Sequence, residues 1–345
     1  MILVTGGAGF VGSHFILDWL ATSDEPVVNV DALTYAGNLQ NLDSVAGDAR
    51  HRFVHGDIVD SELIASLLAR HRPRAIVNLA AESHVDRSIR TPGDFVRTNV
   101  EGTFRLLEAA RRHWLGLSET ERAGFRFLQV STDEVYGSLA PGAAPFAESQ
   151  PQAPNSPYAA SKAAADHLVR AWHQTYGLPV LTTHCGNNFG PRHFPEKLIP
   201  LALGRALERR PIPLYGDGEQ VRDWIHVGDH CSALRLILAQ GRVGEVYNIG
   251  AGLERSNRQV VGSLCGLLDE LRPHPAGPYA GLITPAPDRP GHDRRYGVDA
   301  GKLRRELGWR AHHGFESGLR ETVAWYLQNP DWLQARLDRP TAPAA

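Results

Sequence analysis

Residues 2–15, ILVTGGAGFVGSHF, decide the fold class of this chain. An apolar run, Ile2 to Val4, leads into a turn with Gly6, Gly9 and Gly12 in a G-x-x-G-x-x-G spacing, and a helical pattern follows. Glycines let the backbone pass close to a pyrophosphate, and the N-terminus of the following helix offers unpaired N–H groups to that anion. The stretch therefore predicts the first βα unit of a dinucleotide-binding domain.

The second apolar run, Val27 to Val30, leads to Asp31, about twenty residues beyond Gly12. A carboxylate at this place accepts hydrogen bonds from the adenosine ribose hydroxyls and repels a 2′-phosphate, so the sequence predicts NAD as cofactor. Asp57, in the run HGDI at 55–58, is a weaker candidate for holding the adenine. The alternative is a glycine turn used only for tight helix packing, with Asp31 at the surface.

Further apolar runs continue the pattern. Phe53 to Val54, Ala75 to Leu79 and Phe127 to Val130 are separated by stretches long enough for helices, and Val180 to Thr183 follows a helical stretch from Ser161 to Tyr176. Strands that alternate with helices are typical of βαβ units. We therefore predict an α/β protein with a Rossmann-type parallel sheet.

The pattern changes from Pro191 onward, where prolines and glycines separate shorter elements. A helix at Leu198 to Leu207 precedes a loop at Tyr215 to Gly218, and Ala276 to Pro290 is predicted as an irregular loop. Residues 339–345 are predicted as a frayed tail. We expect a smaller C-terminal substrate-binding domain in this half.

No single residue separates the two parts, because Val246 to Gly250 looks like a strand that returns to the first sheet. We therefore assign residues 1–190 to an NAD-binding Rossmann domain, rejoined by about 222–250. Residues 191–335 are assigned mainly to a discontinuous substrate-binding domain.

Composition narrows the class of partner. The chain has 345 residues, of which 42% are hydrophobic and 21% charged, and its net charge of −2 provides neither a basic stripe for nucleic acid nor a polybasic membrane anchor. Cys185, Cys231 and Cys265 lack the spacing of a zinc site or a disulfide framework, so we expect structural thiols and no metal. The N-terminus shows no basic leader and no membrane-spanning run, so the expected location is the cytoplasm.

Tyr158 and Lys162 stand four residues apart at the start of a predicted helix, so their side chains share one face. A nearby ammonium favours the phenolate and is expected to lower the pKa of the tyrosine, which would make it a base for a sugar hydroxyl. An isolated pair of this kind is most often a surface feature. The cofactor turn upstream and the preceding Asn155 to Pro157 favour the catalytic interpretation.

At this point the chain resembles the extended short-chain dehydrogenase/reductase family, in which a Y-x-x-x-K pair follows such a glycine turn. Within that family residues 131–137, STDEVYG, resemble the dTDP-glucose 4,6-dehydratases, whereas epimerase relatives usually lack the adjacent acid pair. Further segments resemble the same branch: AESHVDRS at 81–88, NN at 187–188, PEKLIP at 195–200, RDW at 222–224 and DRPGHDRRY at 288–296. The resemblance covers almost the whole chain.

The resemblance implies a hydro-lyase that converts dTDP-glucose, or a related nucleotide sugar, to its 4-keto-6-deoxy product. Thr132 would bind the C4 hydroxyl while Tyr158 and Lys162 assist hydride transfer to NAD. Glu134 would remove the C5 proton and Asp133 would protonate the departing C6 hydroxyl. Asp133 must then begin protonated, which requires a pKa raised by burial or by a neighbouring carboxylate.

The same resemblance supplies the binding residues. Arg222 is the first candidate for the diphosphate, ahead of Arg289 and Arg294, because guanidinium groups pair with phosphate in a bidentate geometry. Candidate cofactor-binding residues are Gly6, Gly9, Phe10, Val11, Gly12, Asp31, Asp57, Ile58, Ala80, Ala81, Asn99, Tyr158 and Lys162. Candidate substrate-binding residues are Ser83, His84, Asn187, Glu196, Lys197, Tyr215, Arg222, Asn257, Asp288, His292 and Tyr296.

Three departures from the branch put the fine substrate preference in doubt. Gly186, Phe189 and Arg192 stand where these dehydratases typically carry Ser, Tyr and Tyr. Arg192 adds a positive charge that would accommodate a different nucleotide or sugar, or face solvent. We expect the chemistry to be unchanged.

Two rival functions use the same fold. A nucleotide-sugar 4-epimerase or decarboxylase would act through Tyr158 and Lys162, but the Asp133–Glu134 pair argues against it; a UDP-sugar dehydratase stays open. A silent NAD-binding regulator would not need Thr132, Tyr158 and Lys162 intact. For assembly we expect a homodimer joined through the apolar helices around Phe104 to Ala110 and Ala163 to Trp172.

Overall fold

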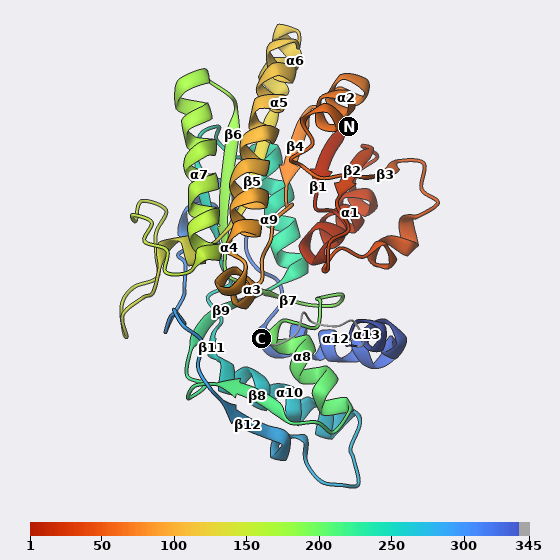
Figure 1. The fold of residues 1–345 in the computed structure, drawn as a ribbon, viewed down its shortest axis with the longest axis vertical. Helices are drawn as coiled ribbons and strands as arrows, with labels where there is room; N and C mark the ends of the chain where they lie inside the picture. The colour runs from red at the N-terminus through yellow and green to blue at the C-terminus, as the bar shows by residue number, and fades with distance from the viewer. Residues whose placement is uncertain (338–345) are drawn as a thin grey trace.

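The computed structural model describes residues 1–337, and the predicted tail at 339–345 lies outside this part. A seven-stranded parallel sheet, in the order β10-β6-β5-β4-β1-β2-β3, forms the larger part of the molecule (Figure 1). Six of its strands follow the 3-2-1-4-5-6 order of dinucleotide-binding sheets, and β10 extends it. The strands are β1 (Ile2–Thr5), β2 (Val27–Asp31), β3 (His51–His55), β4 (Ala75–Asn78), β5 (Arg126–Thr132), β6 (Val180–Cys185) and β10 (Val246–Ile249).

Successive side chains of β1 point to opposite faces of the sheet, and each face is covered by a layer of helices. Ile2 and Val4 belong to a core with α1 (Phe10–Thr22) and α9 (Val227–Gln240). Leu3 belongs to a core on the other face, covered by α2 (Ser61–His71), α5 (Thr103–Leu115) and α7 (Pro157–Tyr176). Both faces of the sheet are buried, which explains why its strands appear in the sequence as continuous apolar runs.

A second, smaller core is built from the later half of the chain and lies below the large sheet in Figure 1. Its centre contains Phe189, Trp224, Leu264, Phe315 and Tyr326. The strands are β7 (Asn187–Phe189), β9 (Val221–His226) and β11 (Glu254–Ser256) in one sheet, and β8 (Ile212–Tyr215) and β12 (Ile283–Ala286) in another. The helices are α8 (Leu198–Leu207), α10 (Asn257–Leu271), α12 (Phe315–Gln328) and α13 (Pro330–Leu337).

Shorter elements connect these layers. They are α3 (Val85–Arg90), α4 (Pro92–Phe95), α6 (Glu119–Gly124) and α11 (Gly301–Leu307), a π-helical segment η2 (Val96–Gly102), and the 3₁₀ segments η1 (Leu39–Val45), η3 (Asp133–Tyr136) and η4 (Tyr279–Leu282). No helix among the described residues is both long and apolar enough to cross a membrane.

The structure confirms the predicted parallel sheet and the return of residues 246–249, which pair with β6. Helix α7 begins at Pro157, four residues before the predicted start at Ser161, because Ser156 caps it by accepting the Ala159 N–H at 3.1 Å. The prediction of a wholly irregular loop at Ala276 to Pro290 was wrong, since η4 and β12 lie inside it. Strand β12 pairs with β8, about seventy residues earlier, and so distant a partner leaves no local signal.

Residues 222–250 divide between the two cores. Strand β9 pairs with β7 and β11, whereas α9 packs on α1 and β10 joins the large sheet. Ala300, Leu303 and Trp309 also pack into the core under α1 and α9, although they lie late in the chain. The chain therefore passes between the two cores several times.

Candidate active site

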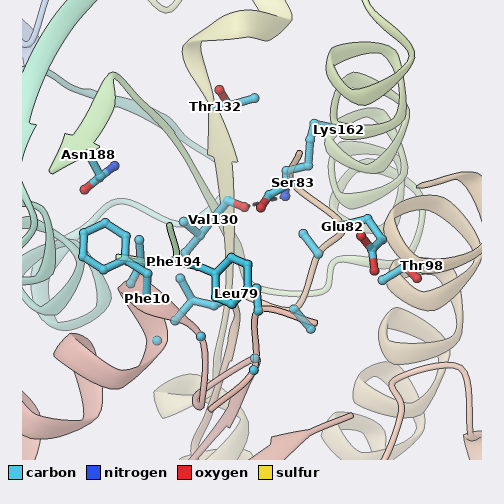
Figure 2. A pocket seen from close by; sticks show the side chains of 18 of the residues that line it. Phe10, Leu79, Glu82, Ser83, Thr98, Val130, Thr132, Lys162, Asn188 and Phe194 are labelled. Atoms are coloured by element: carbon cyan, nitrogen blue, oxygen red, sulfur yellow. Dashed lines mark hydrogen bonds between the residues drawn. The ribbon is translucent and has the colours of Figure 1, made fainter. Parts of the chain in front are cut away.

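A cavity of about 320 Å³ lies at the C-terminal ends of the sheet strands (Figure 2). This edge of an open α/β sheet is where ligands bind, because loops there leave a crevice at the change of strand order. The predicted residues of the glycine turn, Asp31, Asp57, Ile58, Ala80 and Ala81 all line the cavity. Thr132, Asp133, Glu134, Tyr158 and Lys162 line the same cavity from the other side of the turn.

The glycine turn is shaped by close backbone approaches. Gly6 has φ +71°, and a Cβ there would lie 2.6 Å from the Ala80 backbone nitrogen. A Cβ on Gly12 would lie 2.1 Å from the Gly6 carbonyl oxygen. Helix α1 begins at Phe10 with Gly9 as an N-cap that has no side chain, so the first-turn N–H groups stay available to an anion. The turn therefore fits the pyrophosphate of a dinucleotide.

Asp31 is a buried carboxylate at the end of β2. The Ala8 N–H donates to its Oδ2 at 2.9 Å and the Leu33 N–H to its Oδ1 at 2.8 Å. Burial raises the pKa of Asp31, and these backbone bonds oppose the rise. The fixed carboxylate fits ribose hydroxyls and not a 2′-phosphate, in agreement with NAD.

Two residues predicted to bind the cofactor differ in position. Asp57 lines the cavity, accepts the Val59 N–H at 3.1 Å and lies 3.4 Å from Arg97. Asn99 does not line the cavity: its amide donates to the Glu82 carbonyl at 3.0 Å and accepts the Glu82 N–H at 2.9 Å. Asn99 therefore fixes Glu82, which does line the wall.

The two predicted catalytic acids follow directly from the end of β5. Thr132 accepts the Glu134 N–H at 3.3 Å and so begins the single 3₁₀ turn η3, which places both acids at the sheet edge. Asp133 is buried, and its Oδ2 has no hydrogen-bond partner within the described chain. Burial raises its pKa well above the usual range, and Glu134 and Asp223 raise it further. A protonated Asp133 is what a general acid requires.

Glu134 lies in a different electrostatic environment. Burial raises its pKa as well, but Arg289, Arg222 and Lys197 all act in the opposite direction. The three cations come from distant segments of the chain, and each lowers the pKa of this carboxylate. Neighbouring carboxylates whose surroundings differ in this way can serve as acid and base in one reaction.

Tyr158 and Lys162 both lie at the start of α7, yet the lysine does not activate the phenol as predicted. The Lys162 ammonium donates to the Val130 carbonyl at 2.7 Å, a bond drawn in Figure 2. Burial raises the pKa of Tyr158 well above its usual range, Glu134 adds to the rise, and a hydrogen bond with Thr132 opposes it. The expected lowering is therefore absent, because burial and the nearby acids raise the pKa of Tyr158.

All but two of the predicted substrate residues fall into two groups. Ser83, Asn187, Glu196 and Lys197 line the cavity, and the Lys197 ammonium donates to the Ser83 carbonyl at 2.7 Å. The second group contains further residues predicted for the substrate or its diphosphate. We name it the basic cluster, and its members are Tyr215, Arg222, Asp288, Arg289, His292 and Tyr296.

Internal contacts hold the basic cluster together. The Arg222 guanidinium lies 4.2 Å from the centre of the Tyr296 ring, and His292 lies 2.5 Å from Asp288. Asp86 accepts from Arg289 at 3.1 Å and from the Tyr215 hydroxyl at 3.3 Å. None of these cluster residues lines the cavity, but Arg222 and Arg289 lie close enough to lower the pKa of Glu134.

His84 and Asn257 lie outside both groups. His84 accepts the Arg87 N–H as the cap of α3, and burial lowers its pKa to about 3, so its ring is neutral. Asn257 begins α10, where its backbone N–H donates to the Gln220 carbonyl at 3.0 Å.

Several lining residues were missed by sequence reasoning. Cys185, predicted as a structural thiol, lines the cavity, and burial raises its pKa to about 12, so it is a neutral thiol. Asn188 and His230 also line it, with His230 Nδ1 2.9 Å from Asn188 Oδ1. Asn188 is the second residue of the NN motif at 187–188 and could have been found, but His230 lies on α9 and carries no sequence signal.

Of the three departures, only Gly186 reaches the cavity. A Cβ at Gly186 would lie 2.6 Å from the Asp223 carbonyl oxygen, so the serine of the dehydratases would not fit here without a shift of β9. Phe189 is buried against Trp224 and Phe315. Arg192 lies over the Trp325 ring at 5.3 Å, so its charge does not enter the cavity.

One histidine group bears on the expectation of no metal. Among residues 1–337, His226, His313 and Glu321 bring three ligand-type atoms within 4.8 Å of one another. His226 Nδ1, however, accepts the Gly228 N–H at 3.3 Å, and burial lowers the pKa of this histidine to about 4. The neutral ring then carries its proton on Nε2, which leaves no lone pair there for a cation.

Comparisons with known proteins agree with this geometry. The family model described as GDP-mannose 4,6 dehydratase matches residues 3–322. A dTDP-glucose 4,6-dehydratase of Xanthomonas campestris pv. campestris is 59% identical over 97% of this chain and 95% of its own length. DesIV, a dTDP-glucose 4,6-dehydratase of Streptomyces venezuelae solved with NAD bound, is 48% identical with a TM-score of 0.87, covering 96% of this chain and 98% of its own.

A UDP-glucose 4-epimerase of Thermotoga maritima shares the fold at lower similarity. It is 29% identical with a TM-score of 0.82, covering 95% of this chain and 99% of its own. The higher identity to the dehydratases agrees with the acid pair at the end of β5. The chain belongs to the dTDP-glucose 4,6-dehydratase family.

Proposed function

We propose that this chain is an NAD-dependent dTDP-glucose 4,6-dehydratase that releases dTDP-4-keto-6-deoxyglucose and water. The observation that carries the proposal is the pair Asp133 and Glu134, which share one cavity wall but differ in electrostatic surroundings. A 4-epimerase needs no acid and base at C5 and C6, so the pair favours elimination.

In the first step Tyr158, with Thr132, takes the proton of the C4 hydroxyl. The glycine turn and Asp31 would hold NAD, which would supply a hydride acceptor for C4 and later a hydride donor for C6, so that no net oxidation results. The raised pKa of Tyr158 means that its phenolate must be favoured by the charges that surround the bound sugar. The Lys162 ammonium, one turn along α7, is the cation that this chain contributes.

The second step is elimination of water across C5 and C6 of the 4-keto sugar. Glu134 takes the C5 proton, which the adjacent ketone acidifies, and the electron pair moves into the forming C5–C6 double bond. Asp133 gives its proton to the C6 hydroxyl, which leaves as water. Once C6 has received its hydride, Glu134 gives a proton, by then exchanged with solvent, to C5. Tyr158 releases to solvent the proton that it took from the C4 hydroxyl, and Asp133 regains one from solvent, so every group returns to its starting state.

The nucleotide is proposed to extend from the cavity toward the basic cluster. Arg222 and Arg289 supply positive charge for the diphosphate, and Tyr215 supplies a ring for the pyrimidine. We assign NAD binding to residues 1–190 with about 222–250, and substrate binding mainly to residues 191–335. Glu196 and Lys197, which line the cavity, are the proposed contacts nearest the nucleotide base.

The proposed assembly is a homodimer joined through α5 and α7. Phe104, Leu115 and Tyr176 are 42%, 51% and 42% exposed on these helices. The Phe104 ring meets Trp172 edge to face at 5.7 Å, which joins the apolar side chains of the two helices that a second copy would cover. Light scattering of the purified protein tests this directly.

The proposed location is the cytoplasm. Cys185, Cys231 and Cys265 are buried free thiols, which fits a reducing compartment.

The test of the function is incubation with dTDP-glucose and, separately, UDP-glucose in deuterated water, followed by mass spectrometry. We expect a dTDP-sugar lighter by one water, with solvent deuterium at C5 and no added NAD consumed. Dehydration of UDP-glucose alone would change the substrate assignment. An isomer formed without loss of water would overturn the dehydratase proposal in favour of an epimerase.

A further inference from the structure

Helix α7 carries a third buried ionisable residue behind Tyr158 and Lys162. Asp166 lies four residues beyond Lys162, on the same face of the helix, and is 6% exposed. The steps proposed above make no use of it. A buried carboxylate needs partners that favour its charge, so its surroundings deserve an explanation.

Two donors hold one oxygen of this carboxylate. The Ser131 hydroxyl donates to Asp166 Oδ2 at 2.7 Å, and His184 Nε2 lies 3.1 Å from the same oxygen. Asp166 Oδ1 is buried without a hydrogen-bond partner in the described chain. One oxygen of the carboxylate is therefore fixed, and the other is free to act on charge nearby.

The hydrogen bonds beyond His184 determine where its protons lie. The Asn248 side-chain amide donates to the Phe146 carbonyl at 2.8 Å, so its oxygen is the group that faces Tyr136. The Tyr136 hydroxyl donates its single proton to that oxygen at 2.9 Å. Tyr136 must then accept from His184 Nδ1, 2.7 Å away, while His184 Nε2 shares a hydrogen bond with Asp166 Oδ2 at 3.1 Å. His184 therefore links Tyr136 to Asp166.

Lys162 lies one turn before Asp166 on the same face of α7. Its ammonium has three N–H donors but contacts only the Val130 carbonyl within the described chain. Burial lowers the pKa of Lys162, and Asp166 is the largest influence against that fall, ahead of Cys185 on β6. The other ionisable groups near this end of α7 are Tyr158 on the same helix and the acids of η3.

We propose that Asp166 is a positioning residue of the reaction: its carboxylate, held by Ser131 and His184, keeps the Lys162 ammonium protonated inside the core. The charge of Lys162 in turn favours the phenolate of Tyr158. This inference rests on the proposed function, because it concerns the same oxidation step. It adds Ser131, His184 and Tyr136 as the residues that hold the counter-charge in place.

The test is Asp166→Asn, which keeps the shape of the side chain and removes its charge. The rate of NADH formation on mixing enzyme-bound NAD with dTDP-glucose is measured against pH. Without the carboxylate, Lys162 loses its proton at lower pH, so the alkaline decline of the rate is expected to move down by about one pH unit. At the alkaline end the variant would be about tenfold slower than the wild type, against about twofold near neutral pH.

A second readout follows Tyr158 without substrate. Near-ultraviolet difference absorbance, with Tyr158→Phe subtracted in each background, reports the ionisation of that one phenol among nine tyrosines. We expect the Tyr158 phenolate to appear at higher pH in Asp166→Asn. The matched control is Asp229→Asn, since Asp229 is also buried but holds the backbone N–H groups of His312 and His313.

The outcomes separate the inference from the function. A rate that falls by the same factor at every pH, with no shift in the phenol titration, means a purely structural role and overturns the inference. If Asp166→Asn does not fold, Ser131→Ala removes one hydrogen bond from the Asp166 carboxylate with a smaller change. This variant must also move the alkaline decline of the rate to lower pH. If the wild type forms no NADH from dTDP-glucose, the proposed function fails, and the phenol titration still decides the role of Asp166.

Discussion

The cofactor edge of the sheet and the basic cluster beside it are built from different contacts. At the cofactor edge the backbone itself makes the site, with Gly6 and Gly12 closer to neighbouring backbone atoms than any Cβ allows. In the basic cluster, charged side chains such as Arg289 and Asp86 neutralise one another. A preformed backbone site tolerates little change, whereas ion pairs can exchange partners. Single substitutions should therefore reduce ligand affinity or turnover more at the cofactor edge than in the basic cluster.

Asp133 lies where the two regions meet, and its replacement should have the largest effect. Asp133→Asn cannot supply the proton for the C6 hydroxyl, so turnover should fall about 1000-fold. NADH formation in the first step should persist, because Tyr158 is intact. Rapid-mixing absorbance separates the two steps. Equal loss in both would mean that Asp133 acts on binding and not on elimination.

Gly12→Ala tests the rigidity of the cofactor edge. The added Cβ would lie 2.1 Å from the Gly6 carbonyl, so the turn must move and affinity for NAD should fall about 100-fold. Isothermal titration with NAD measures this, and Gly47→Ala is the control because a Cβ there meets nothing within 4 Å. An unchanged affinity would show that the cofactor edge is as adaptable as the cluster.

Arg289→Gln tests whether the basic cluster acts on the cavity from a distance. Glu134 must be ionised to act as base, and Arg289 is the strongest of the influences that lower its pKa. Removing this cation raises the pKa of Glu134, so the acid limb of the pH–rate profile should move up by about one unit, with about tenfold loss below it and little loss above.

The control for this shift is Arg294→Gln in the same loop. Arg294 pairs with Asp217 at 2.8 Å and is not among the groups that lower the Glu134 pKa. An identical shift in both variants would point to overall charge and would remove the special role of Arg289.

Tyr215→Phe should have the smallest effect. Its hydroxyl bonds Asp86 at 3.3 Å in a residue that is 39% exposed, so KM should rise about twofold with kcat unchanged. The ring, which is the part proposed to stack on the pyrimidine, is retained. A tenfold rise measured by steady-state kinetics would show that the cluster is as finely built as the cofactor edge.

Most of the cofactor site could be predicted from contiguous residues. The apolar runs, the glycine spacing and Asp31 lie within one βαβ unit, so motif and geometry coincide. The nucleotide side was harder, since Tyr215, Asn257 and Tyr296 come from separate loops and the strand β12 has no local signal. His230 was missed for the same reason, because a helix residue reaches the cavity only through the packing of α9 on α1.

The sequence by itself determined the sheet, the cofactor turn and the adjacency of Asp133 and Glu134, because each is encoded within a few neighbouring residues. Only the tertiary structure decided how those two acids differ. Arg222, Arg289 and Lys197, from three distant segments, lower the pKa of Glu134, whereas burial, Glu134 and Asp223 raise the pKa of Asp133 and Arg222 opposes that rise only in part. The same holds for Tyr158 and Asp166, since burial and the partners brought by β5, β6 and β10 set their charge, and burial is a property of the folded chain alone.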